Sequence, residues 1–160
     1  ALGWGVDALI SPIFEMYFSE GIIQNTSIAT NGLTAINSHT SNIVLNKVKI
    51  ELHKFKNDMI NTTALIKMES SQVSVENCNI QGTGPGEPLL VGFLLYGNIT
   101  DYKNSLYIKD SYIAYFHGKN GGAISIEAPM KDLIIMNSAF CFNEASNYGG
   151  VFYSSHGNIL

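Results

Sequence analysis

The sequence contains no arginine, and this absence narrows the partners that the protein can have. All nine basic residues are lysines, against thirteen acidic residues, which gives a formal net charge of −4. Proteins that bind DNA or RNA rely on clustered Lys and Arg side chains that contact phosphate. The lysines here form no such cluster, so we expect no nucleic-acid partner.

Cysteine and long hydrophobic runs are also scarce. Cys78 and Cys141 are too few for a disulfide framework, and we expect two free thiols, with pairing to cysteines of a longer chain as the alternative. No stretch approaches the ~20 apolar residues that a membrane span requires, because Asp7 and Pro12 interrupt the most apolar region. We expect no transmembrane segment within this sequence.

The chain does contain enough apolar residues for a folded core. Hydrophobic residues make up 46% of the 160 positions and charged residues only 14%, a composition that argues against disorder. One folded unit is therefore expected.

An internal repeat is the clearest signal in the sequence. Four segments align without gaps: NIVLNKVKI (42–50), QVSVENCNI (72–80), SLYIKDSYI (105–113) and DLIIMNSAF (132–140). Each begins with strict alternation of apolar and polar residues and is rich in Val, Ile, Leu and Tyr, which predicts a β-strand. The steps between successive copies are uneven, whereas the strand pattern itself is constant.

A second apolar segment recurs between these copies, at 63–68, 91–96, 121–126 and 149–154. No Asn-Gly or Asp-Gly hairpin signal separates the segments, which favours an all-β parallel solenoid of about 27–33 residues per coil. Equivalent apolar side chains should then stack inside the coil. The predicted inward rows are Ile43, Val73, Leu106, Leu133; Leu45, Val75, Ile108, Ile135; and Ile50, Ile80, Ile113, Phe140.

Asn77, Asp110 and Asn137 occupy one equivalent position of the repeat, where the first copy has Lys47. Asn and Asp tolerate the left-handed backbone conformation and form local hydrogen bonds. This position therefore predicts a ladder of structural corners, with amide hydrogen bonds exchanged between stacked copies. The Gly-Gly pairs at 121 and 149 predict a further corner.

The whole chain is interpreted as one solenoid segment of a longer protein. Residues 1–30 fit the repeat poorly and are expected to be a degenerate coil or a cap, while residues 31–160 supply about four coils. The final GNIL resembles the start of another copy. Variable polar stretches at 52–59, 82–88 and 96–104 are expected to be loops, and the first of them could form a short helix.

Gly121-Gly122-Ala123-Ile124 together with Phe140-x-x-Asn143 resembles the paired GGA(I/L/V) and FxxN motifs of the polymorphic outer-membrane-protein repeat. That repeat belongs to the class of pectin-lyase-like right-handed parallel β-helices. The resemblance covers roughly residues 103–155, and the GGVF sequence at 149–152 is an imperfect second copy. It implies a surface region in adhesion or structure.

Residues for catalysis are not gathered in the repeat. Enzymes of the resembled class use Arg or clustered Asp, whereas arginine is absent here and the five Asp residues are scattered. Glu76 aligns with Lys109 rather than with a second acid, although a glycosidase needs paired carboxylates. The four His residues fall at different phases of the repeat, so we expect no catalytic site, no cofactor and no metal cluster.

The sequence supplies other candidates for contact with partners. Val44, Tyr107 and Ile134 are expected to form an outward apolar stripe. Possible N-glycosylation sites are Asn25, Asn61 and Asn98. Chance produces such triplets in a chain rich in Asn, Ser and Thr, so an ordinary surface asparagine is the alternative at each position.

These observations lead to a functional hypothesis. We expect a non-enzymatic structural or adhesive solenoid of an extracellular or cell-surface protein, which contacts proteins or glycans and could self-assemble. The alternatives are a carbohydrate-active enzyme or lectin-like module and an accessory subunit of a larger complex.

Overall fold

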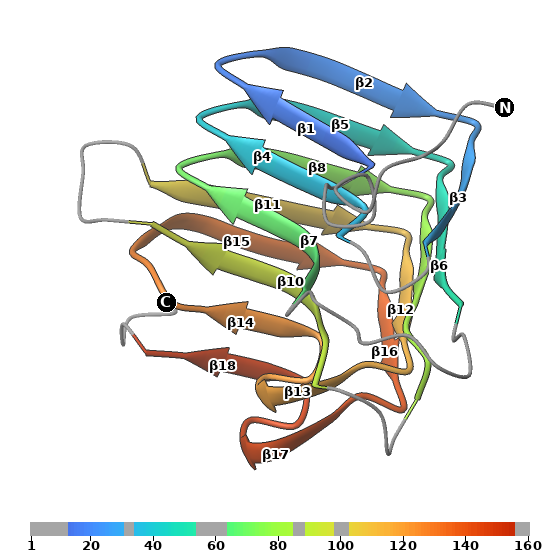
Figure 1. The fold of residues 1–160 in the computed structure, drawn as a ribbon, viewed down its shortest axis with the longest axis vertical. Helices are drawn as coiled ribbons and strands as arrows, with labels where there is room; N and C mark the ends of the chain where they lie inside the picture. The colour runs from blue at the N-terminus through green and yellow to red at the C-terminus, as the bar shows by residue number, and fades with distance from the viewer. Residues whose placement is uncertain (1–12, 31–33, 54–63, 85–88, 98–102, 156–160) are drawn as a thin grey trace, which may run out of the picture.

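The structure is a computed structural model that describes residues 13–30, 34–53, 64–84, 89–97 and 103–155. All regular structure in these residues is β-strand (Figure 1). None of them forms a helix long and apolar enough to cross a membrane.

The strands form three main sheets and one small sheet, and every pairing between named strands is parallel. Sheet A contains β1 (Phe14–Tyr17), β4 (Ile36–His39), β7 (Ala64–Glu69), β10 (Val91–Tyr96), β14 (Ile124–Ile126) and β18 (Phe152–Ser154). Sheet B contains β2 (Glu20–Gln24), β5 (Asn42–Asn46), β8 (Gln72–Glu76), β11 (Asn104–Lys109) and β15 (Met130–Met136). Sheet C contains β3 (Ser27–Thr30), β6 (Lys49–Leu52), β9 (Asn79–Gln81), β12 (Tyr112–Ala114) and β16 (Ala139–Cys141), and sheet D pairs β13 (His117–Asn120) with β17 (Glu144–Tyr148).

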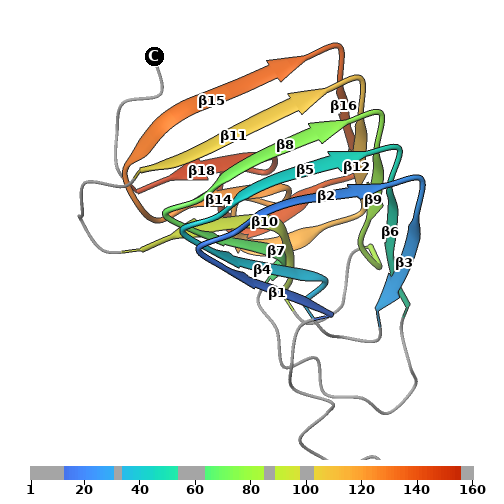
Figure 2. The same cartoon turned by 90° about the horizontal axis from the view of Figure 1, so that it is seen from above.

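The chain visits sheets A, B and C in turn and then returns to sheet A, and we call one such pass a lap. In the two laps that contain β13 and β17, it passes through sheet D before it returns to sheet A. Figures 1 and 2 show successive laps lying on one another, with the blue first lap at one end and the red strands at the other. An all-β fold of parallel strands stacked in sheets is thereby confirmed.

The predicted register of the repeat is confirmed. Val73 lies opposite both Ile43 and Leu106, and Leu106 lies opposite Leu133. The row that contains Ile80 and Ile113 is aligned in the same way. These side chains form the core: in the middle laps the inward residues of all three sheets are almost completely buried.

The first lap, at 13–30, is complete, with three strands. β1, β2 and β3 pair with β4, β5 and β6, and the register places Gly21 opposite Ile43. The step from Gly21 to Ile43 is shorter than the predicted coil length of about 27–33 residues. Two features hid the lap in the sequence: it is short, and Gly21 stands where the other copies have an apolar side chain.

Left-handed backbone marks the corners between the sheets. Asn77, Asp110 and Asn137 have φ values of 53°, 49° and 48°, and Asn25 and Lys47 occupy the same corner with 50° and 54°. The chain turns here from sheet B to sheet C in each lap (Figure 2). Asn and Asp populate this conformation more readily than other side chains.

Hydrogen bonds between laps at this corner do not come from the predicted amide side chains. Among the described residues, no hydrogen bond joins the side chains of Asn77, Asp110 and Asn137 to one another, and these side chains are exposed. The backbone N–H groups of Asn77 and Asp110 donate to the carbonyls of Lys109 and Met136 in the next lap, each at 3.1 Å. The side-chain hydrogen bonds between laps come from the following position. The Ser111 hydroxyl accepts a hydrogen bond from the backbone N–H of Cys78 at 3.1 Å. The Ser138 hydroxyl likewise accepts one from the backbone N–H of Ser111 at 3.1 Å.

Close backbone contact between laps requires glycine at Gly122, the second residue of the first Gly-Gly pair. Gly121 and Gly149 have φ values of 68° and 63°, and the N–H of Gly122 donates to the carbonyl of Gly150 at 3.0 Å. A Cβ atom on Gly122 would collide with that same carbonyl oxygen. Gly122 therefore allows its lap to rest directly on the next one.

Two predicted features lie outside the described residues. The first is the short helix considered for residues 52–59, of which only Leu52 and His53 are described, and Leu52 belongs to β6. The second is the additional repeat copy that begins at Gly157.

Candidate functional site

The outer face of sheet A carries a cluster of polar side chains that contact one another across several strands. Alternation along the strands turns Ile36 and Ser38 into the core, with no exposed surface, and turns Asn37 and His39 outward. The register then aligns outward residues from successive laps. One row contains Tyr17, His39, Glu69 and Tyr96, and the next contains Glu15, Asn37 and Lys67.

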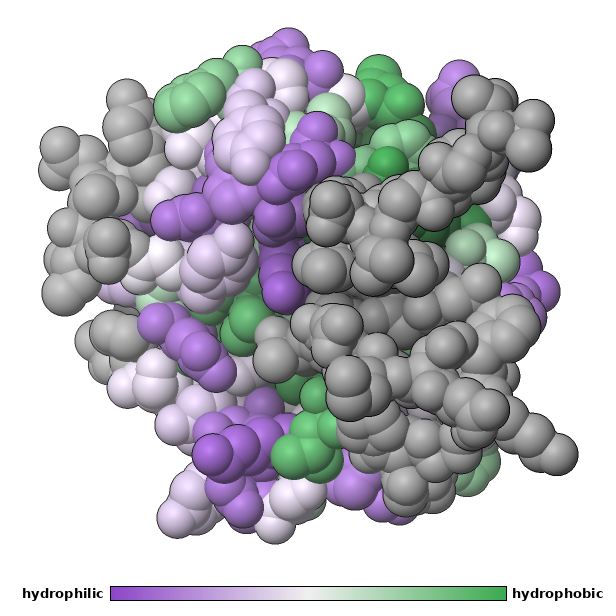
Figure 3. All heavy atoms as spheres, in the orientation of Figure 1, coloured by the Kyte–Doolittle hydropathy of each residue, from purple (hydrophilic) through white to green (hydrophobic). Residues whose placement is uncertain are grey.

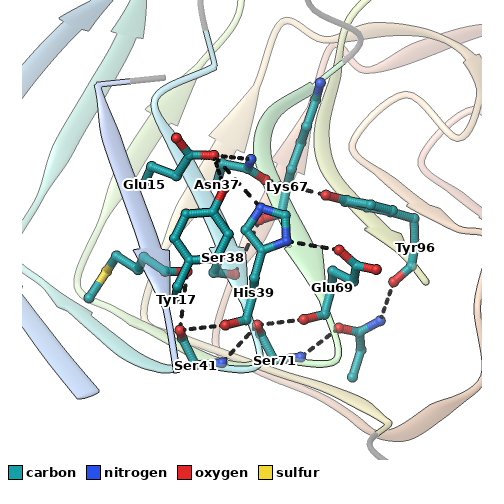
Figure 4. Close-up of polar contacts among 12 residues, drawn as sticks. Glu15, Tyr17, Asn37, Ser38, His39, Ser41, Lys67, Glu69, Ser71 and Tyr96 are labelled. Carbon is teal, nitrogen blue, oxygen red and sulfur yellow. Dashed lines mark hydrogen bonds and ion pairs between the residues drawn. The ribbon is translucent and has the colours of Figure 1, made fainter. Parts of the chain in front are cut away.

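His39 lies at the centre of this cluster, between two carboxylates (Figure 4). Its Nδ1 atom is 2.8 Å from Oε2 of Glu69 on β7, and its Nε2 atom is 3.9 Å from Oε1 of Glu15 on β1. The Tyr17 ring stacks on the imidazole, with centroids 4.5 Å apart and planes 8° apart. His39 thus connects three consecutive strands of the sheet.

Glu15 is the second hub of the cluster. Its Oε1 atom accepts hydrogen bonds from the Tyr17 hydroxyl at 2.6 Å and from Nδ2 of Asn37 at 3.3 Å. The hydrogen bond to Glu15 raises the pKa of Tyr17, because it stabilises the protonated phenol. Tyr96 extends the network by donating to Oδ1 of Asn37 at 3.4 Å.

Partial burial affects two further members of the cluster. It lowers the pKa of Lys67 and raises the pKa of Tyr96, since burial disfavours the charged form of each group.

Tyr17, in contrast to these partly buried side chains, keeps 56% of its surface exposed. Purple hydrophilic side chains gather on this face in the space-filling view (Figure 3). The face therefore combines an accessible aromatic ring with polar groups that are already hydrogen bonded to one another.

The accessibility of His39 restricts the chemistry that this cluster can perform. Its Nε2 atom has almost no solvent-exposed surface and no hydrogen-bond partner. A general base must come within hydrogen-bond distance of the proton that it removes. In this arrangement a substrate cannot reach Nε2 unless neighbouring side chains move.

A metal site is not assembled in the described part of the chain. No group of three or more His, Cys, Asp or Glu residues there has ligand geometry.

The predicted corner residues Asn77, Asp110 and Asn137 line a shallow groove beside Ser111 and Ser138 at the junction of sheets B and C.

The predicted apolar stripe is divided in two by a polar residue. Ser74 lies between Val44 and Tyr107 on the outer face of sheet B, whereas Tyr107 and Ile134 are direct neighbours. Ile22 of the first lap extends the stripe beside Val44 and is 70% exposed. The Tyr107 hydroxyl donates to Asp132 at 3.0 Å, which makes this surface partly polar.

The remaining predicted residues are spread over the molecule. Cys78 and Cys141 are both free thiols. Asn25 is exposed at a corner of the first lap, while Asn61 and Asn98 lie outside the described residues.

The sheet A cluster was missed in the sequence because its members lie outside the four aligned repeat copies. The signal was nevertheless present. The step from His39 to Glu69 equals the step from Ile43 to Val73 in the first two copies. In the same way, the step from Tyr17 to His39 equals that from Gly21 to Ile43 in the short lap.

Comparison of this chain with protein-family models, with curated protein sequences and with solved structures found no match in any of the three.

Proposed function

We propose that the protein is a right-handed parallel β-helix that serves as a non-enzymatic scaffold at the outside of a cell. Its sheet faces and corner loops would contact other proteins or glycans. The regular return of the chain to each sheet supports the β-helix. The GGAI and FxxN motifs, which resemble those of polymorphic outer-membrane-protein repeats, support the assignment to a surface protein.

One observation carries the scaffold function. On the outer face of sheet A, His39 and the carboxylates of Glu15 and Glu69 are engaged with neighbouring side chains from other laps. Such mutual contacts hold the side chains in fixed positions and leave the exposed ring of Tyr17 available. A rigid aromatic ring surrounded by polar groups is suited to binding.

A carbohydrate-active enzyme is the second candidate, and it also rests on one observation. Glu15 and Glu69 lie on the same face, on either side of His39. Paired carboxylates that flank a glycosidic bond are the catalytic groups of most glycoside hydrolases. An accessory subunit of a larger complex remains a variant of the scaffold proposal.

A binding screen combined with a turnover assay tests these functions. The immobilised protein is exposed to purified glycans and extracellular proteins, and the same glycans are assayed for cleavage. The scaffold function predicts retention of at least one ligand without cleavage, and weaker retention by Tyr17→Ser than by the control Tyr148→Ser, at a similarly exposed tyrosine of β17. If the protein cleaves a glycan and both Glu15→Gln and Glu69→Gln lose this activity, the scaffold function is wrong and the protein is a carbohydrate-active enzyme.

A further inference from the structure

The outermost strands of the three main sheets have a partner on one side only. Among the described residues, β1, β2 and β3 each pair with a single strand, and so do β18, β15 and β16. Figures 1 and 2 place these two sets of strands at opposite ends of the stack of laps. The outer edge of such a strand carries backbone N–H and C=O groups that can pair with a further strand.

Large apolar side chains are exposed mainly at these two ends. Of the eleven that are exposed among the described residues, five lie at 13–22 and four at 134–148. The core is incomplete at the same places. Its partly buried hydrophobic members lie only at 16–23 and 130–152, whereas the inward residues of the middle laps are almost completely buried. Both ends therefore present apolar surface of the kind that marks an interaction site.

The register predicts which residues would meet if the last strands of one chain lay on the first strands of another. Each row of aligned residues runs through the whole stack, so it has one member at each end. The three inward rows would bring Ile135 onto Ile23, Phe140 onto Ile28 and Phe152 onto Phe14. These contacts have the composition of the rows that already form the core.

The outer face of sheet B matches in the same way. Ile22, which is 70% exposed, and Ile134, which is 40% exposed, are the two ends of one row. The neighbouring row is charged at both ends, with Glu20 and Asp132, and the register shift in β15 adds Lys131 beside Asp132. This row therefore brings charges of both signs to the contact.

We propose that copies of this chain stack head to tail, with β18, β15 and β16 of one copy against β1, β2 and β3 of the next. A shift along the stack of laps keeps the direction of every strand, so the three parallel sheets would continue from one copy into the other. A partner that supplies a single strand would cover one sheet edge and leave the other two exposed. The proposal goes beyond the scaffold function and does not depend on a ligand at Tyr17.

The two edges are different surfaces, which determines the form of the assembly. A contact between different surfaces, repeated by a shift that does not close, produces an open filament rather than a dimer. Sedimentation velocity of the purified chain over a range of concentrations tests this. The sedimentation coefficient should rise continuously with concentration. A chain that remains monomeric at every concentration, because something else covers the edges, would overturn the proposal, and so would a closed dimer.

Ile22→Lys tests the contact surface. It should weaken the association at least about tenfold, because stacking would bury the new ammonium group against Ile134. Ile22 is an exposed outward residue, so the fold of a single chain should be unchanged, and circular dichroism checks this. Ser74→Lys, in the same row but in a middle lap, is the matched control and should associate like the original chain. Equal association of the two variants would show that this edge is not the contact.

Cross-linking between chains tests the head-to-tail orientation. Two chains are prepared in which both native cysteines are replaced by serine, one with Ile22→Cys and the other with Ile134→Cys. Mild oxidation of the mixture should join the two different chains, because opposite residues on adjacent strands lie within the range for a disulfide. Disulfides only between identical chains would show that copies meet through like edges. That result, or the absence of any disulfide, would overturn the proposal.

Discussion

The side chain of Asn143 holds the backbone of Phe116, which lies one lap earlier in the chain. Oδ1 of Asn143 accepts a hydrogen bond from the Phe116 N–H at 3.1 Å, and its Nδ2 donates to the carbonyl of Ile113 at 3.0 Å. One amide thus satisfies a donor and an acceptor of the preceding lap. This geometry gives the Phe-x-x-Asn sequence at 140–143 a structural role.

Replacing Asn143 tests that role. Asn143→Ala should lower the free energy of unfolding by about 1–3 kcal/mol, because the Phe116 N–H loses its partner in a partly buried site. Urea denaturation monitored by circular dichroism measures the change. Asn147→Ala, at an exposed position of β17, is the control. Equal destabilisation by both variants would show that the amide of Asn143 has no special function.

Replacement by alanine should have different effects on stability at Gly122 and at Gly150, the second residues of the two Gly-Gly pairs. A Cβ at Gly122 would collide with the carbonyl oxygens of Gly150 and Glu144, whereas the nearest atom to a Cβ at Gly150 is the Asn143 carbonyl oxygen, 3.8 Å away. Gly122→Ala should therefore destabilise the protein by about 1–3 kcal/mol or more. Gly150→Ala should be nearly neutral. Thermal unfolding of the two variants provides the comparison, and similar melting temperatures would contradict the predicted stacking.

The corner at Lys47 offers a stabilising substitution. Lys47 has a φ of 54° at the position that Asn or Asp occupies in the other laps, and an ordinary side chain in this conformation costs about 1–2 kcal/mol. Lys47→Asn should recover a part of that cost, up to about 1 kcal/mol. Asn77→Val should have the opposite effect.

Lys109→Asn separates the corner effect from the change of residue type. Lys109 is the exposed last residue of β11, immediately before the corner, and its φ is not positive. Its replacement should give no stabilisation in the urea unfolding experiment. An increase equal to that of Lys47→Asn would show that the gain does not come from the left-handed backbone.

Cys78 should make stability depend on pH in the alkaline range. Burial raises the pKa of its thiol, so the unfolded chain loses the proton at a lower pH than the folded chain does. The stability from this group is complete below the ordinary thiol pKa of about 8.5 and falls as the pH rises above it, by at most about 1.4 kcal/mol per pH unit.

Cys78→Ser isolates this contribution. Ser111 and Ser138 occupy the equivalent position in the next laps, so serine fits the corner and does not titrate in this range. Free energies of unfolding at pH 7 and pH 9.5 should differ less in the variant than in the original protein. An identical difference in the two proteins would contradict a raised thiol pKa.

The repeat predicts the part of the fold that depends on inward side chains. Rows such as Ile43, Val73, Leu106 and Leu133 could be aligned because burial inside a strand imposes a period of two and a common hydrophobic pattern. Corner positions such as Asn77 could be found for a similar reason, since few residues tolerate left-handed backbone.

The outer faces could not be predicted in the same way. No burial constraint acts on His39, Glu69 and Tyr17, so their alignment depends on the lengths of individual laps. The short first lap and its Gly21 gave too little hydrophobic pattern to fix that length. Ser74 likewise interrupts the apolar stripe because an outward position accepts a polar residue without cost to the core.

Cross-linking between laps tests the central claim, the fixed stacking of one lap on the next. Asn46 lies opposite Glu76 on the outer face of sheet B, and adjacent strands are about 4.8 Å apart, within the range for a disulfide. In a chain with both native cysteines replaced by serine, Asn46→Cys with Glu76→Cys should form an intramolecular disulfide on mild oxidation. Asn46→Cys with Ser74→Cys, displaced by two residues, should not. Closure of the displaced pair, with the opposite pair remaining reduced, would contradict the account.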